Sequence, residues 1–149
     1  MVPIPLAGYQ VQISGDGQSA EIVWTDDVPD VHHGGVVLVD GYIYGANWLN
    51  NANGNWCSIN WETGEKMWEE QWHCKGSVIA AEGMLYIYDE RQGNVGLAEA
   101  THEKFNLISS FQVTHTNSGP FWAHPVIHNG RLYLRHNNAF MAYDIEKAL

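Results

Sequence analysis

Four side chains are candidates for binding a ligand: His33, Lys75, Trp122 and His124. Imidazole and ammonium groups bind anions and hydrogen-bond acceptors, and an indole adds a flat apolar surface with one N–H donor. The four residues are far apart in the sequence, yet each stands six or eight positions before a glycine that follows an acidic residue or Asn. They form a site only if the fold brings these segments together.

Three further candidates lie in polar segments. Asn47 belongs to the Asn-rich segment 47–55, Arg91 to residues 89–94 and Arg135 to residues 135–138. Each has an ordinary structural explanation as well, because Asn suits turns and exposed Arg or Lys is often only solvated. Taken together, a funnel of His, Lys, Arg, Trp and Asn side chains is the best candidate for a binding site in this chain.

The elements that must position these residues form a repeat. A short apolar run, an acidic or Asn residue followed by Gly, and an aromatic strand recur three times. The copies are residues 36–45, 78–89 and 125–136. Their turn glycines, Gly41, Gly83 and Gly130, stand 42 and 47 residues apart. This is the period of a four-stranded propeller blade, and Asp-Gly and Asn-Gly pairs between β-rich runs predict tight hairpins.

The fold class that we predict is all-β: a partial β-propeller of about three four-stranded antiparallel blades, with about thirteen strands and no helix. The whole chain, 1–149, is one propeller segment that begins and ends within a blade. Its parts are an outer half-blade at 9–27, blades at 33–72 and 75–113, and an incomplete blade at 122–146. An irregular β-sandwich is the alternative, but it would show no self-match at such a period.

In a propeller blade the strands run from the inside to the outside. The connections into the first strand and between the second and third strands therefore lie on one face, which we call the funnel face. All seven candidates lie in those connections, and the Gly41-type and Thr63-Gly64-type turns lie on the opposite face. The positions that precede the innermost strands should converge at the mouth of the central channel.

Composition excludes several classes of function. Seven Lys and Arg against seventeen Asp and Glu give a net charge of −10, which excludes nucleic acid and anionic membrane surfaces as partners. A hydrophobic content of 45% with 16% charged residues excludes an intrinsically disordered chain. No apolar stretch reaches the roughly 18 to 20 residues of a membrane span. Residues 1–10 lack the features of a signal peptide, so we expect a mature, truncated or cytosolic chain.

Residues 59–68, Ile-Asn-Trp-Glu-Thr-Gly-Glu-Lys-Met-Trp, resemble the blade signature A-x-D-x-x-T-G-x-x-x-W of pyrroloquinoline-quinone-like propeller repeats. Members of that family include quinoprotein alcohol dehydrogenases and non-enzymatic proteins of outer-membrane assembly. The resemblance implies that Trp68 packs between adjacent blades, and that Trp24 and Phe111, which hold the same place in their units, do so too. It also implies a periplasmic or secreted location, which the sequence itself leaves open.

The histidines and cysteines favour no metal or disulfide. His32 and His33 are adjacent, and neighbours on a strand point to opposite faces. No HExxH spacing is present, so His33 with His124 is the one weak metal-binding hypothesis. Pairing the hairpin about Thr63-Gly64 sets Cys57 opposite roughly Glu70 and leaves Cys74 ~13 Å further along. That distance exceeds the reach of a disulfide, which predicts two free thiols.

Three functions agree with these observations. We favour a non-catalytic binding or scaffold propeller that holds a small molecule or protein at the funnel face, with no cofactor for this chain alone. The alternative is a fragment of a quinoprotein dehydrogenase with pyrroloquinoline quinone and calcium, although the chain has no adjacent cysteines and no residue that matches the base or calcium positions. A glycan-binding or glycan-acting propeller is a third reading, suggested by Trp and Asn.

An open propeller leaves sheet edges that invite pairing, so we expect another propeller half as a partner. Residues 9–24 of a second copy could complete the blade that ends at Asp144, which would give a closed C₂ ring of about six blades. The competing account is a longer propeller whose early blades are missing here.

Overall fold

The computed structural model describes residues 8–114 and 118–146 of the 149-residue chain. Over these ranges the regular elements are thirteen β-strands, as the repeat predicts. They are β1 (Gly8–Ile13), β2 (Ala20–Asp26), β3 (Val36–Val39), β4 (Tyr42–Ala46), β5 (Trp56–Asn60), β6 (Lys66–Glu70), β7 (Gly76–Ala81), β8 (Met84–Asp89), β9 (Asn94–Glu99), β10 (Leu107–Gln112), β11 (Val126–His128), β12 (Arg131–His136) and β13 (Ala139–Asp144). No helix in the described ranges is long and apolar enough to cross a membrane.

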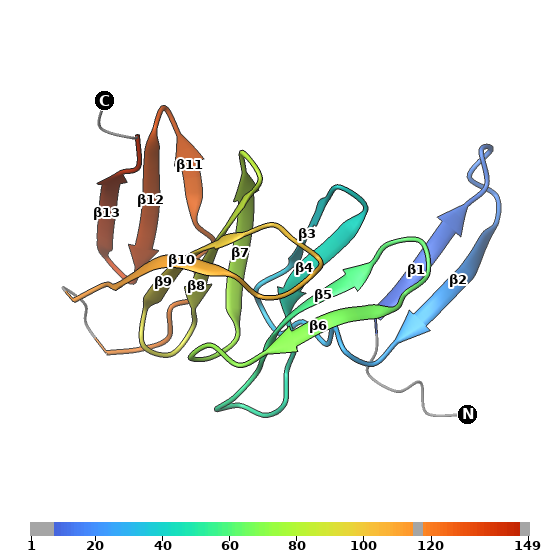
Figure 1. The fold of residues 1–149 in the computed structure, drawn as a ribbon, viewed down its shortest axis with the longest axis horizontal. Helices are drawn as coiled ribbons and strands as arrows, with labels where there is room; N and C mark the ends of the chain where they lie inside the picture. Colours follow the sequence, from blue (N-terminus) through green and yellow to red (C-terminus); the bar gives the residue numbers. More distant parts are fainter. Residues whose placement is uncertain (1–7, 115–117, 147–149) are drawn as a thin grey trace.

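The strands form four antiparallel sheets in chain order: the hairpin β1–β2, the sheets β3–β6 and β7–β10, and the three-stranded sheet β11–β13. Figure 1 shows these sheets following one another along the long axis, with the two chain ends at opposite ends of the molecule. One buried cluster, which includes Tyr44, Trp56 and Leu85, joins β3–β6 to β7–β10. A second, which includes Tyr88 and Leu132, joins β7–β10 to β11–β13.

Local turn chemistry explains the first hairpin of each unit. Both central residues have positive φ in all three turns, for example 49° at Asp40 and 83° at Gly41. This is the type I′ geometry, whose twist matches that of the flanking strands and which Asn or Asp followed by Gly adopts most readily. The sequence signal and the observed pairing therefore agree at the level of single dihedral angles.

A tryptophan joins neighbouring sheets at equivalent places. Trp24 Nε1 in β2 donates to the carbonyl oxygen of Trp61, 2.8 Å away, and Trp68 Nε1 in β6 donates to that of Thr101, also at 2.8 Å. Gly64 has a φ of 74°, and a Cβ there would lie 2.8 Å from Trp24 Cδ2. The Thr-Gly of the signature thus provides both the turn and the space for the indole of the preceding sheet.

Phe111 occupies the third equivalent place, in β10, opposite Val95. Its ring contacts that of Tyr143 in β13 at a centroid distance of 4.7 Å. A phenyl ring has no N–H donor, so the contact between β7–β10 and β11–β13 lacks the hydrogen bond that the two indoles make.

We predict that Trp68→Phe lowers the free energy of unfolding by about 1 to 2 kcal/mol, because the Thr101 carbonyl loses its donor while most of the ring packing is kept. Urea unfolding followed by far-UV circular dichroism measures this change. Trp61→Phe is the matched control, since the hydrogen bond at Trp61 uses its backbone carbonyl and not its indole. Equal losses in the two variants would show that the indole N–H of Trp68 contributes nothing.

Glycines allow the sheets to approach closely at their inner strands. A Cβ at Gly34, just before β3, would overlap the carbonyl oxygen of Gly76 at the start of β7. Within its own sheet, a Cβ at Gly76 would also overlap the carbonyl oxygen of Tyr88 in the neighbouring strand β8, so the Gly34–Gly76 contact is the one between sheets. Backbone therefore packs directly on backbone where two sheets meet.

The two cysteines are buried and unpaired with each other. Cys57 lies opposite Glu69 rather than Glu70, so the predicted register is wrong by one residue. The reason is that the turn centres on Glu62-Thr63: Asn60 Oδ1 accepts from the backbone N–H groups of both. A bulge between Ser58 and Ile59 then offsets part of the shift.

Burial, reinforced by the Glu69 carboxylate, raises the pKa of the Cys57 thiol from 9.0 to about 12. The unfolded thiol loses its proton near its ordinary pKa while the folded one keeps it, so deprotonation favours unfolding. The contribution of Cys57 to stability is present below about pH 9 and is lost as the pH rises toward 12. We predict a shallower alkaline loss for Cys57→Ala, measured by urea unfolding between about pH 8 and about pH 10. Parallel losses in the two proteins would contradict this.

Candidate functional site

A cavity of about 360 Å³ opens where four connecting segments meet. The segments precede β3, join β4 to β5, join β8 to β9, and precede β11. The lining residues are His32, Asn51, Glu90, Arg91, Gly119, Pro120 and Trp122. Its size lies at the lower end of the range for small-molecule sites.

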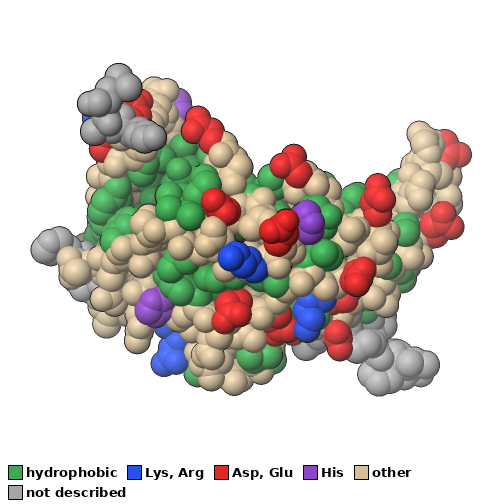
Figure 2. All heavy atoms as spheres, viewed as in Figure 1, with side chains coloured by type: hydrophobic (Ala, Val, Ile, Leu, Met, Phe, Trp, Pro, Cys, Tyr) green, Lys and Arg blue, Asp and Glu red, His purple; other side chains and the backbone are tan. Residues whose placement is uncertain are grey.

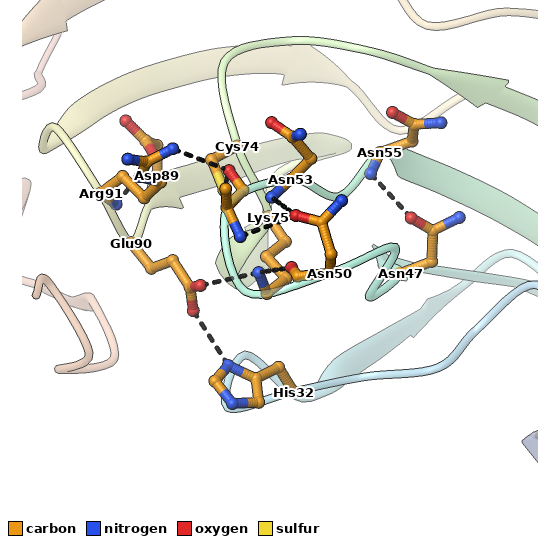
Figure 3. Close-up of polar contacts among 11 residues, drawn as sticks. His32, Asn47, Asn50, Asn53, Asn55, Cys74, Lys75, Asp89, Glu90 and Arg91 are labelled. Atoms are coloured by element: carbon orange, nitrogen blue, oxygen red, sulfur yellow. Dashed lines mark hydrogen bonds and ion pairs between the residues drawn. The ribbon is translucent and has the colours of Figure 1, made fainter. Parts of the chain in front are cut away.

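Glu90, one of the lining residues, belongs to a buried ion pair (Figure 3). Lys75 Nζ is 3.0 Å from Glu90 Oε1, and the two residues are 1% and 6% exposed. Lys75 Nζ also donates to the carbonyl oxygen of Asn50, at 2.9 Å. Glu90 Oε2 is 3.3 Å from His32 Nδ1, so both carboxylate oxygens have a partner. A buried pair of this kind is tolerated only when such additional hydrogen bonds are made.

The Asn-rich loop between β4 and β5 is held by its neighbours. Asn47 donates to Glu69 Oε1 at 2.7 Å and accepts from the backbone N–H of Asn55. The carbonyl oxygen of Ala52 accepts from Arg91 Nη1 at 3.1 Å and from Cys74 Sγ at 3.3 Å. Figure 3 shows Arg91 and Cys74 beside the loop. Together with the Glu69 contact, these contacts anchor the loop to both four-stranded sheets.

Aromatic rings form one wall of the cavity. The His33 and Trp122 rings have centroids 4.4 Å apart, and those of His32 and His33 are 3.9 Å apart. The adjacent histidines thus share a side, contrary to the strand-based expectation, because residues 32–34 form a bend and not a strand. His124 Nε2 lies 3.0 Å from the His33 carbonyl oxygen and fixes this bend.

A second cavity, of about 320 Å³, shares Pro120 and Trp122 with the first. Arg135 and His136 line it from β12. Arg135 Nε donates to the carbonyl oxygen of Asn137 at 2.9 Å, and His136 is buried beneath it, with Nε2 3.0 Å from the Gly119 carbonyl oxygen. Trp122 is 50% exposed and lies between the two cavities.

The predicted site residues fall into two groups. Trp122, Arg91, His33 and Arg135 are exposed around the paired cavities, and His124 supports them from the side. Lys75 and Asn47 are buried and hydrogen-bond to other parts of the chain, so the structure does not bring their side chains to the surface. These seven residues stay predictions as ligand-binding groups.

Sequence reasoning missed His32, Glu90 and Asn51. Glu90 follows directly on the last residue of β8, within the segment that contains Arg91, so its position could have been noticed. Its pairing with His32, 58 residues earlier, depends on how two sheets pack. No local sequence pattern reports that packing.

Charge at the two cavities differs from charge over the whole chain, which is −10. The exposed charged side chains that line them are Arg91 and Arg135, while Glu90 is buried against Lys75. On the face drawn in Figure 2, Asp and Glu side chains clearly outnumber Lys and Arg. The exposed charges at the cavities are thus positive, on a molecule that is acidic as a whole.

No cluster of three or more His, Cys, Asp or Glu side chains in the described ranges could hold a metal ion. His124 Nε2 faces the His33 carbonyl oxygen and not its ring nitrogen. This arrangement gives no support to the pair as a metal site.

No family model matches the chain, and no curated protein sequence matches it. Among solved structures, the crystal structure of BamB from Moraxella catarrhalis is similar, with a TM-score of 0.54 and 11% identity. The match covers 83% of this chain and 50% of that one. The fold is a partial β-propeller. At this identity the likeness shows the fold alone, so the resemblance to pyrroloquinoline-quinone-like repeats remains a prediction.

The sheets β3–β6 and β7–β10 each have the four strands of a propeller blade, whereas β11–β13 has three strands and β1–β2 has two. This chain spans about half the length of the BamB chain that it matches. The cavities on either side of Trp122 lie where the sheets β7–β10 and β11–β13 meet the loops of the sheet β3–β6.

Proposed function

We propose that this chain is a non-catalytic binding or scaffold propeller segment that holds a small molecule or a partner segment in the cavities on either side of Trp122. The observation that supports it is an exposed indole and an exposed guanidinium standing over an internally paired Lys75–Glu90 floor. Accessible aromatic and Arg side chains in a concave site are the usual anchors of binding surfaces.

The state of Glu90 favours binding over catalysis. A carboxylate that acts as a general base needs an oxygen within reach of a substrate proton. Glu90 Oε1 is engaged by Lys75 and Oε2 by His32. The side chain serves as a counter-ion, and the residues that reach the cavity surface around it are donors and rings.

The uncovered face of β11–β13 supports a partner at the propeller end. Val126 and Tyr133 take the places that Val37 and Tyr44, and Ile79 and Tyr86, take in the first two blades, where both pairs pack in buried clusters. Here a hollow of about 590 Å³ remains beside them, and Phe140 is 70% exposed. Another propeller half, from a second copy or from a longer chain, would cover it. Measurement of the molecular mass in solution tests whether a second copy covers this face. A pure monomer excludes a dimer of this kind.

A ligand panel tests the proposed binding site. Nuclear magnetic resonance spectra of the ¹⁵N-labelled protein are recorded with amino acids, organic acids, neutral sugars and short peptides. We expect one chemical class to shift the Trp122 indole signal, assigned with Trp122→Phe. The signal of Trp61, an exposed tryptophan beside the opposite Thr63-Gly64 turn, should stay in place. If no class moves Trp122, or if Trp61 moves equally, the proposal fails.

The enzymatic alternative has its own test. Pyrroloquinoline quinone and calcium are added to the full chain, and cofactor absorbance and dye reduction with alcohols are measured. Specific binding with dye reduction would replace the binding function by that of a quinoprotein dehydrogenase. A shift of the Trp122 signal by neutral sugars alone would instead favour glycan binding.

A further inference from the structure

We propose that the cavity lined by Arg91 and Trp122 binds a monocarboxylate that also carries a flat aromatic ring, as in a free aromatic acid or a peptide chain that ends in an aromatic residue. This inference rests on the proposed function and names the ligand class of the same site. Arg91 provides the group that binds the carboxylate, and Trp122 provides the surface against which the ring packs.

Arg91 is held in place for this role. Its Nη1 donates to the Ala52 carbonyl oxygen at 3.1 Å, and its backbone N–H donates to Asp89 Oδ1 at 2.9 Å. A guanidinium carries several N–H donors in a fixed fork, and the side chain is exposed at the cavity rim. One N–H of Arg91 is used by the Ala52 carbonyl oxygen. The remaining N–H donors of the planar guanidinium can bind both oxygens of a carboxylate.

The buried charges set the charge of the ligand. Glu90 forms an ion pair with Lys75, and Asp89, fully buried, accepts from the backbone N–H groups of Arg91 and Gln92. Lys75 balances the Glu90 charge, so Asp89 is the carboxylate that opposes an anion here, and it opposes a dianion such as phosphate more strongly than a monoanion. The Arg91 charge at the rim attracts the anion. A monoanion is the best compromise between the two.

The shape of the cavity selects the rest of the ligand. One side of Trp122 contacts His33, at 4.4 Å between ring centroids, and half of the residue remains exposed. Pro120 and Gly119 add surface without charge. Aromatic rings pack on an indole in offset or edge-on geometry, and such pairs add to the gain from area burial. A ligand with a flat ring close to its carboxylate can therefore pack on Trp122 while Arg91 binds the carboxylate.

The experiment compares N-acetylphenylalanine with its amide by isothermal titration calorimetry and by the Trp122 indole signal, using the full chain. The acid should bind. The affinity of the amide should be lower by at least about tenfold, because a charge-assisted hydrogen bond is lost. The Arg91→Gln and Trp122→Ala variants should each bind the acid more weakly than the wild type, by a similar factor. Arg91→Lys, which keeps the charge but loses the fork, should give an intermediate value.

Arg131→Gln is the matched control, because Arg131 is an exposed arginine next to the Gly130 turn on the opposite face, and it should bind as the wild type does. The proposal is overturned if acid and amide bind with equal affinity, if Arg91→Gln binds the acid as tightly as the wild type, or if the wild type does not bind the acid. If neutral sugars move the Trp122 signal and the acid does not, the binding function survives and this ligand class is wrong. A peptide ending in Phe that binds more tightly than N-acetylphenylalanine identifies a chain end as the source, and equal affinity identifies a free acid.

Discussion

Gly34→Ala should lower the free energy of unfolding by about 3 kcal/mol or more and could prevent folding altogether. The added Cβ would overlap the carbonyl oxygen of Gly76, which belongs to the first residue of β7 and cannot rotate away as a side chain could. Relief requires the first full blade to move relative to the second, and that movement would disturb the cluster of Tyr44, Trp56 and Leu85. Urea unfolding and the yield of soluble protein measure the effect.

Gly15→Ala is the matched control for this variant. Gly15 lies in the β1–β2 turn region, has nothing within 4 Å of an added Cβ, and has no positive φ. Its substitution should change stability by less than about 0.5 kcal/mol. If the two variants unfold at the same urea concentration, the close backbone contact between the blades is not present in solution.

Lys75→Met should cost about 3 kcal/mol or more, because it leaves the Glu90 carboxylate buried without its counter-ion. The Asn50 carbonyl oxygen also loses its donor, which loosens the loop between β4 and β5. The double variant Lys75→Met with Glu90→Gln removes both charges and should be more stable than the sum of the single losses implies. Urea unfolding of the wild type, both single variants and the double variant completes the cycle.

Lys66→Met provides the control for the loss of a lysine. Lys66 Nζ is also 3.0 Å from a carboxylate, that of Glu69, but its side chain is 46% exposed. Exposed pairs contribute less than about 1 kcal/mol. A Lys75→Met loss no larger than that of Lys66→Met would mean that water reaches the Lys75–Glu90 pair.

The strand pattern was predictable because its signals are local. Asp40-Gly41 and Asn129-Gly130 adopt the turn that their residue types favour, and the runs around them pair as expected. Trp24 and Trp68 contact the next sheet in the chain. Repetition amplifies such signals, since an ambiguous segment in one unit is read against a clearer one in another.

The floor of the candidate site was not predictable in the same way. Lys75 was expected in the funnel, yet it is buried by Glu90 and the Asn50 carbonyl oxygen, contacts that arise from three different connections. The strand rule places His32 and His33 on opposite sides, and this does not hold in the bend that residues 32–34 form. Loop conformation and long-range pairing decide both cases.

Phe111 in place of a tryptophan makes the junctions between the sheets unequal. Indole-to-carbonyl hydrogen bonds join β1–β2 to β3–β6 and β3–β6 to β7–β10, whereas the equivalent place of the last junction has ring packing. Beside the cavity this last junction is held by backbone, because the Phe121 N–H donates to the Glu90 carbonyl oxygen at 2.8 Å. A ligand seated between Arg91 and Trp122 would add contacts across the same junction, so its occupancy and the angle of the last sheet would be coupled.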